Sequence, residues 1–203
     1  MHLLFITRKG PGIGGMQKLH GDLWRMFREM EGVRVHRVSP LGIFDITYPV
    51  RVVILSLWAL FAQWRVHLGD ASLAPLGLLL KVLGVPRVTL TACGLDVIYP
   101  PQWYQALLRW SLPKLDHIVC ISRATAREAE QRGVMKFSVI PCGVAHVPSR
   151  TMRCEQRSHG HPPVLLTIAR LVPRKGVPWF CKEVLPLVLM DFPSLTYLII
   201  GSG

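Results

Sequence analysis

A loop near the end of the sequence carries three cations in a pattern suited to binding a polyanion. Residues 167–176 read Thr-Ile-Ala-Arg-Leu-Val-Pro-Arg-Lys-Gly, after an apolar run at 164–168 and before apolar residues at helical spacing over 177–189. We expect this loop at the carboxyl end of a buried strand, where ligands bind in open α/β sheets. Arg170 and Lys175 could converge there on one diphosphate. The spacing fits a solvated basic turn equally well.

A second candidate for anion binding is the glycine-rich loop of residues 10–15, which precedes a helical pattern. Glycine lets the backbone approach a ligand closely, and the first turn of a helix favours negative charge. Gly10, Gly12 and Gly15 also satisfy G-x-G-x-x-G, which leaves an NADP-dependent oxidoreductase open as an alternative. NAD is disfavoured, because residues 34–39 offer arginine and serine where its fingerprint requires a carboxylate. A tight turn alone would need fewer glycines.

The overall charge indicates an anionic partner. The 203 residues, half of them apolar, include 24 Lys and Arg against 12 Asp and Glu, for a net charge of +12. A nucleotide, a nucleic acid or an acidic membrane surface would complement this charge. We expect no nucleic acid, because the cations are scattered between apolar segments and neither an RNA-binding strand motif nor a zinc-finger spacing is present.

Cysteine usage and the N-terminus favour a cytoplasmic protein. The five cysteines form no C-x-x-C pair, as in a reduced chain, and Cys154 with His159 and His161 matches no zinc spacing, so no metal is expected. The N-terminus lacks a cationic leader, and the apolar run at 52–62 is shorter than the roughly 20 residues that span a bilayer. Because the segment 50–64 is apolar and the chain is cationic, we expect weak, salt-sensitive attachment to the inner, anionic face of the membrane.

The order of the expected elements predicts the fold class. Apolar runs typical of buried strands alternate with helical patterns, which favours an α/β protein with a doubly wound parallel sheet. Ser122 is expected to cap one of the helices. Strands are expected at 2–6, 33–38, 66–70 (with a loop), 87–91, 117–121, 137–140, 164–168 and 199–200, and helices at 16–30, 43–64 (with an interruption at Pro49), 73–83, 103–112, 123–131 and 177–189.

A change in composition predicts the domain organisation. Residues 1–148 form one complete domain, and residues 149–163, rich in Ser, Arg, His, Gln and Pro without apolar periodicity, are interpreted as a linker. Residues 164–203 hold a single strand–helix–strand unit. This is too little to build a stable core, so we expect the start of a second, truncated domain.

Six segments, taken in order, resemble the front half of a family 4 retaining glycosyltransferase of the GT-B architecture, which has two Rossmann-like domains. They are residues 14–15, 92–96, 121–125, 140–144, 170–176 and 199–203. The resemblance implies transfer of a sugar from a nucleotide-diphosphate sugar to a glycan or lipid-linked acceptor, with retention of configuration. It implies neither a cofactor nor a metal, because arginine and lysine stabilise the departing diphosphate.

The resemblance also assigns roles to individual residues. Cys93, Arg170 and Lys175 would be catalytic, the two cations holding the donor diphosphate across the cleft between the domains. The first domain would bind the acceptor. The implied donor-binding residues are Gly14, Gly15, Gly94, Asp96, Ser122, Arg170, Lys175, Gly201 and Gly203.

Four positions depart from the family pattern. Cys93 replaces a histidine that contacts the donor sugar, Cys142 an asparagine, Ala145 an aspartate and Ala169 a glycine. A thiol is a poorer hydrogen-bond partner than imidazole. The family's pair of glutamates, seven residues apart, is expected beyond Gly203. We therefore expect these 203 residues to bind a nucleotide diphosphate weakly without transferring sugar. A non-catalytic module that binds a nucleotide sugar or an anionic lipid is a further alternative.

Overall fold

The structure is a computed structural model that describes residues 1–10, 14–42, 45–143 and 162–203. The chain divides into two compact units, Met1–Val144 and Ala145–Gly203. Most of the predicted linker, residues 149–163, lies outside the described residues, as does the predicted end of the first domain at residue 148. Cys154, His159 and His161 lie outside them as well.

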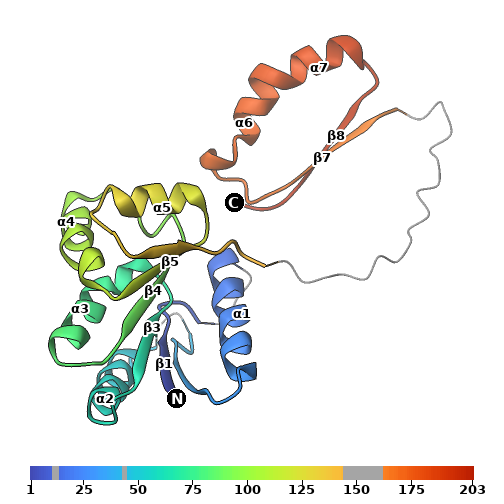
Figure 1. Ribbon diagram of the computed structural model, residues 1–203. Helices are drawn as coiled ribbons and strands as arrows, with labels where there is room; N and C mark the ends of the chain where they lie inside the picture. The colour runs from blue at the N-terminus through green and yellow to red at the C-terminus, as the bar shows by residue number, and fades with distance from the viewer. Residues whose placement is uncertain (11–13, 43–44, 144–161) are drawn as a thin grey trace. The chain divides into compact units, whose positions relative to one another are not determined.

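The first unit is built on a six-stranded parallel sheet (Figure 1). Its strands pair in the order β2-β1-β3-β4-β5-β6, which confirms the predicted doubly wound parallel sheet. The chain reverses its direction of progress across the sheet between β1 and β3, and ligands of such sheets bind outside the carboxyl ends of the strands at this point. The strands are β1 (His2–Ile6), β2 (Arg34–Val38), β3 (Arg65–Leu68), β4 (Val88–Ala92), β5 (His117–Cys120) and β6 (Phe137–Val139).

The core of this unit lies on the central strands. Continuous apolar runs are typical of parallel strands covered on both faces, and residues 3–6 of β1 form such a run, whereas β3 and β4 are mostly buried although they include His67, Thr89 and Thr91. Residues without solvent exposure include Leu4, Phe5, Ile6, Val66, Leu68, Val88 and Leu90.

Helices flank the sheet and connect its strands. They are α1 (Gly15–Glu29), α2 (Tyr48–Phe61), α3 (Ala74–Val82), α4 (Gln102–Ser111) and α5 (Arg123–Glu130). The predicted cap is confirmed, because the Ser122 hydroxyl accepts a hydrogen bond from the Thr125 N–H at 3.1 Å at the start of α5. Among the helices that the structure describes, none is long and apolar enough to cross a membrane.

The helix predicted over residues 43–64 is shorter in the structure. Pro49 lies in the first turn of α2, where a missing N–H removes no helical hydrogen bond, so the proline starts the helix and does not interrupt it. The helix ends at Phe61, and Gln63 adopts a left-handed conformation with φ of 55°. Residues 43 and 44 lie outside the described part of the chain.

The second unit contains a parallel pair of strands, β7 (Val164–Ile168) and β8 (Thr196–Ile200), joined by a helical segment. This segment consists of α6 (Val177–Trp179), a π-helical turn (Phe180–Val184) and α7 (Leu185–Asp191). The π-helical turn precedes Pro186, which lacks the N–H that a regular helix would use at that point. Side chains that alternate along the strands, including Val164, Leu166 and Ile168, are exposed on one face of the pair.

Candidate active site

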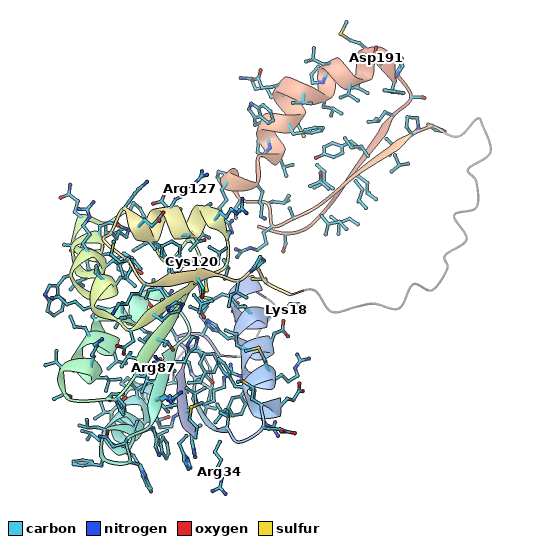
Figure 2. All side chains as sticks on the ribbon, viewed as in Figure 1. Lys18, Arg34, Arg87, Cys120, Arg127 and Asp191 are labelled. Atoms are coloured by element: carbon cyan, nitrogen blue, oxygen red, sulfur yellow. The ribbon has the colours of Figure 1, made fainter. Side chains whose placement is uncertain are left out.

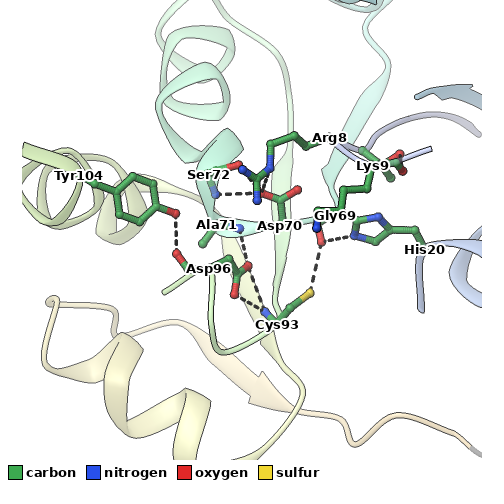
Figure 3. A network of polar contacts seen from close by, with 11 residues as sticks. Arg8, Lys9, His20, Gly69, Asp70, Ala71, Ser72, Cys93, Asp96 and Tyr104 are labelled. Carbon is green, nitrogen blue, oxygen red and sulfur yellow. Dashed lines mark hydrogen bonds and ion pairs between the residues drawn. The ribbon is translucent and has the colours of Figure 1, made fainter. Parts of the chain in front are cut away.

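Polar loops gather at the carboxyl edge of the first sheet (Figure 3). Because the strands are parallel, their carboxyl ends meet at one edge. There β1 leads into Arg8 and Lys9, β3 into Gly69 and Asp70, and β4 into Cys93. The edge includes the reversal point between β1 and β3, which is where ligands bind in sheets of this kind.

The carbonyl oxygen of Gly69 is shared by two side chains from distant parts of the chain. His20, fully buried in α1, donates through Nε2 at 2.7 Å, and the Cys93 Sγ lies 3.6 Å away. Burial lowers the pKa of His20, so the ring is neutral at pH 7. A Cβ on residue 69 would lie 2.8 Å from this Nε2 and 2.9 Å from Thr7 Cγ2, so the close packing requires glycine.

Cys93, predicted as a catalytic residue, follows β4 at this edge. Burial raises the pKa of its thiol, with smaller contributions from the negative charges of Asp96 and Asp70. The group therefore remains a neutral thiol at pH 7, a weak donor to the Gly69 carbonyl and a poor nucleophile. Its contact with a donor sugar remains a prediction.

Asp96, predicted to bind the donor, is 5% exposed, and both of its oxygens accept from the backbone. The carboxylate accepts from the Ala71 N–H at 2.7 Å and from the Cys93 N–H at 2.9 and 3.1 Å. Burial raises the pKa of this carboxyl, and the backbone donors oppose the shift. Asp96 thus joins the loop after β3 to the loop after β4, and its contact with a donor remains a prediction.

Asp70 is a member of this network that the sequence interpretation missed. Its side chain is fully buried, accepts from the Ser72 N–H at 3.1 Å, and lies 3.6 Å from the Nε of the half-exposed Arg8. Within the described part of the chain its second oxygen has no hydrogen-bond partner. The sequence does hold a signal for this residue, because an aspartate two positions beyond an apolar strand of a parallel sheet falls at the ligand-binding edge.

The remaining predicted residues of the first unit lie on loops or helix starts. Gly14 precedes the first turn of α1 in an extended conformation, and a Cβ on Gly15, which begins that helix, would have no atom of the described residues within 4 Å. Gly94 follows Cys93, and its carbonyl accepts from the Val97 N–H at 2.9 Å. Gly12, the middle glycine of the dinucleotide pattern, lies outside the described residues. The donor-binding role of Gly14, Gly15, Gly94 and Ser122 remains a prediction.

The basic loop of the second unit follows β7, as the sequence predicts. Arg170, Arg174 and Lys175 are all exposed. Within the residues that the structure describes, none of the three forms an ion pair with a carboxylate. The loop backbone is held by hydrogen bonds from the Leu171 N–H to the Ser202 carbonyl at 3.0 Å and from the Lys175 N–H to the Val172 carbonyl at 2.9 Å. The loop thus offers unpaired positive charge on a defined backbone.

Gly201 and Gly203 support this loop from the chain that follows β8. A Cβ on Gly201 would lie 1.8 Å from the Ala169 carbonyl oxygen, and one on Gly203 would lie 2.5 Å from the Leu171 carbonyl oxygen. Both positions therefore require glycine for a close approach of two backbone segments. The structure supports a positioning role for them, and direct contact with a donor remains a prediction.

The fold and these loops define a Rossmann-like α/β protein with polar loops at the carboxyl ends of its strands. The sequence profile of Glycosyltransferase Family 4 matches residues 22–147, more than half of the chain. The chain therefore belongs to Glycosyltransferase Family 4, which favours the glycosyltransferase interpretation over an NADP-dependent oxidoreductase. No curated protein matches the chain in sequence.

Two solved structures share the fold. A crystal structure of Anabaena Alr3699/HepE in complex with UDP aligns with a TM-score of 0.62 at 14% identity, covering 98% of this chain and 69% of HepE. A second, of HepE in complex with UDP and glucose, aligns with a TM-score of 0.61 at 16% identity, covering 98% of this chain and 60% of HepE. This protein thus spans between three fifths and seven tenths of the chains that it resembles.

Proposed function

We propose that this chain is part of a retaining glycosyltransferase of the GT-B type, which transfers a sugar from a nucleotide-diphosphate sugar to a glycan or lipid-linked acceptor. In this proposal further chain completes the second domain and supplies the family's glutamate pair. The exposed apolar face of β7 and β8 supports this, because a doubly wound sheet is covered on both faces. The partial coverage of HepE supports it as well.

The basic loop of the second unit is the observation that carries this proposal. Arg170 and Lys175 lie in the loop that follows the carboxyl end of β7. No carboxylate in the described part of the chain forms an ion pair with either of them. In glycosyl transfer, negative charge develops on the departing diphosphate. Fixed cations at that position stabilise the transition state more than the ground state. The HepE structures contain UDP, which makes a uridine nucleotide the first donor to test.

In the same proposal the carboxyl edge of the first sheet binds the acceptor and contributes donor contacts through Gly14, Gly15 and Gly94. The Gly69 carbonyl and the Asp96 carboxylate hold the loops after β3 and β4 together, so groups at this edge are preorganised. Cys93 lies among them as a neutral thiol. The thiol donates to the Gly69 carbonyl, with Sγ 3.6 Å from the oxygen.

Calorimetric titration of the 203-residue chain with UDP tests the role of the basic loop. We expect Arg170→Ala and Lys175→Ala each to weaken UDP binding about fivefold, since an exposed hydrogen bond to a charged group contributes about 1 kcal/mol. Lys182→Ala is the matched control, because Lys182 is an exposed cation of the same unit that pairs with Glu183 outside the loop. Equal affinities of all four proteins for UDP would contradict the proposal, and tighter binding of NADPH than of UDP would favour the oxidoreductase.

A non-catalytic nucleotide-sugar-binding module is the second candidate. The observation that favours it is Cys93, whose neutral thiol stands where the family pattern has a histidine. The two candidates are distinguished by measuring the release of nucleoside diphosphate by a chain that is extended through its second domain. A binding module would bind the nucleotide sugar without releasing the diphosphate in the presence of acceptors.

A further inference from the structure

Helix α2 presents an apolar stripe on its outer face. The side chains of the stripe recur at three- and four-residue intervals, so they line one side of the helix. All of them are exposed, Trp58 to 60% and Phe61 to 83%, whereas Val52, Ser56 and Ala59 on the opposite side are buried. The members of this α2 stripe are Val50, Val53, Ile54, Leu57, Trp58 and Phe61.

Helices α1 and α5 expose charged side chains instead, whereas α3 exposes Leu79 and Val82, and α4 exposes Trp103 and Trp110. The exposed positions of α1 include Lys18, Arg25 and Arg28, and those of α5 include Arg123 and Arg127. A helix that is apolar on all sides is normally buried, and a contiguous exposed patch of this kind marks an interaction site. The stripe also lines a shallow hollow formed by Ile54, Leu57, Trp58, Phe61 and Ala62.

A row of arginines lies at the amino edge of the same sheet. Arg34 begins β2 and Arg65 begins β3, on either side of β1, and the Arg87 carbonyl accepts from the Val66 N–H at 2.9 Å. Neighbouring strands lie about 4.8 Å apart, so the backbones of Arg65 and Arg87 are adjacent. All three residues are exposed, and within the described chain none forms an ion pair. Figure 2 shows Arg34 at the bottom of the first unit, Arg87 above it and Arg127 at the top of the unit.

The α2 stripe and the arginine row are neighbours. Helix α2 ends three residues before Trp64, which directly precedes Arg65. The ring of Trp64 lies 6.4 Å from that of Trp58 and stacks on His36 at 4.4 Å. The aromatic end of the stripe therefore borders the cationic edge of the sheet.

We propose that the α2 stripe and the amino-edge arginines together bind the surface of a bilayer with anionic headgroups. The apolar side chains would enter the boundary between headgroups and acyl chains, with Trp58 at the polar interface, and the arginines would contact lipid phosphates. A second copy of the chain is disfavoured as the occupant, because two arginine rows would repel each other. The proposal does not depend on the proposed function. It leaves the carboxyl edge of the sheet free, because that edge is opposite the arginine row.

Sedimentation with vesicles of phosphatidylglycerol and phosphatidylcholine tests the proposal. We expect the 203-residue chain to bind these vesicles and not pure phosphatidylcholine, and to dissociate in 0.5 M salt, roughly five times the ionic strength at which the Debye length is about 10 Å. The double variant Arg65→Gln/Arg87→Gln should bind about 25-fold more weakly, about fivefold for each arginine. The matched control Arg109→Gln/Arg127→Gln, which removes the same charge from α4 and α5, should bind nearly as well as the natural chain.

The apolar contribution is tested with Trp58→Ser/Phe61→Ser, which should lower binding to the anionic vesicles at least tenfold. Its matched control is Trp103→Ser/Trp110→Ser, which removes two exposed aromatic rings from α4. Circular dichroism confirms that each variant is folded. In a second measurement, brominated lipids should quench the fluorescence of the natural chain. Trp58→Phe, which keeps the apolar surface, should lose most of this quenching while still binding.

Four results would overturn the proposal. Two of them are equal binding to neutral and anionic vesicles and no binding to either. The other two are an equal loss of binding in the control Trp103→Ser/Trp110→Ser and unchanged binding by folded Trp58→Ser/Phe61→Ser. Quenching that persists in Trp58→Phe would place another part of the chain in the bilayer.

Discussion

Substitution of Asp96 tests whether one buried carboxylate holds two loops of the candidate site together. Its oxygens accept from the Ala71 N–H at 2.7 Å and from the Cys93 N–H at 2.9 and 3.1 Å, and the side chain is almost completely buried. In Asp96→Asn an NH₂ group replaces one oxygen. With the amide oxygen at the Oδ1 position, the Ala71 N–H faces the NH₂ group and has no acceptor; with the oxygen at the Oδ2 position, it accepts from both N–H groups and the Cys93 N–H also faces the NH₂ group.

The cost follows from these contacts. A buried N–H without a partner costs about 1–3 kcal/mol, and in Asp96→Asn both N–H groups can share the one amide oxygen, so we expect this variant to lower the free energy of unfolding by about 1 kcal/mol. Asp96→Ala leaves two backbone donors without a partner and should cost about 4 kcal/mol. The matched control is Asp22→Asn, which removes exposed ion pairs to Lys18 and Arg25 and should cost at most about 1 kcal/mol.

Urea denaturation followed by circular dichroism measures these free energies. A second measurement follows the site itself, because Asp96 also holds the backbone of Cys93. Mass spectrometry of the native protein after brief alkylation should show faster modification of Cys93 in Asp96→Asn than in Asp22→Asn. If both variants lose the same stability and alkylate Cys93 at the natural rate, the conclusion that Asp96 positions this loop is wrong.

Three further predictions concern pH, the thiol and turnover. The ring of His67 is hydrogen-bonded to the hydroxyl groups of Thr89 and Thr91. Burial lowers the pKa of His67 to about 4. The unfolded chain therefore binds more protons between about pH 4 and 6.5, and stability should fall by about 3 kcal/mol as the pH drops through this range. In urea melts at several pH values, the free energy of unfolding of His67→Leu should change less steeply with pH in this range, by about one proton. An unchanged slope would refute the assignment of this pH dependence to His67. In a chain extended through its second domain, Cys93→His should bind the donor about fivefold more tightly, equivalent to about 1 kcal/mol for one hydrogen bond. A lower melting temperature without a gain in affinity would instead indicate a packing role for Cys93. In a coupled assay with several nucleotide sugars and a lipid extract, the 203-residue chain should release no nucleoside diphosphate above background, and steady turnover would contradict the proposed incomplete second domain.

The sequence by itself determined the strands, most of the helices and the edge at which the site lies. Buried parallel strands are rich in apolar and β-branched residues, and their carboxyl ends share one edge, so the positions of Cys93 and Arg170 at strand ends followed from local pattern alone. The cap at Ser122 could be predicted for the same reason, since capping depends on residues only a few positions apart.

Tertiary structure alone decided which side chains meet and which face of α2 remains open. His20 and Gly69 are 49 positions apart, and only the placement of β3 beside β1 brings them into contact. His20 does fall on the apolar side of α1, four positions after Met16. The hydrophobic periodicity of a helix, however, does not show which residues a side chain will contact. At Gly201 the sequence could not show the close approach of the backbone to the Ala169 carbonyl, which leaves no room for a side chain. Helix α2 is mostly apolar, and its polar residues Arg51 and Ser56 are partly or fully buried, so its hydrophobic pattern does not tell its inner face from its outer face, and only packing distinguishes them.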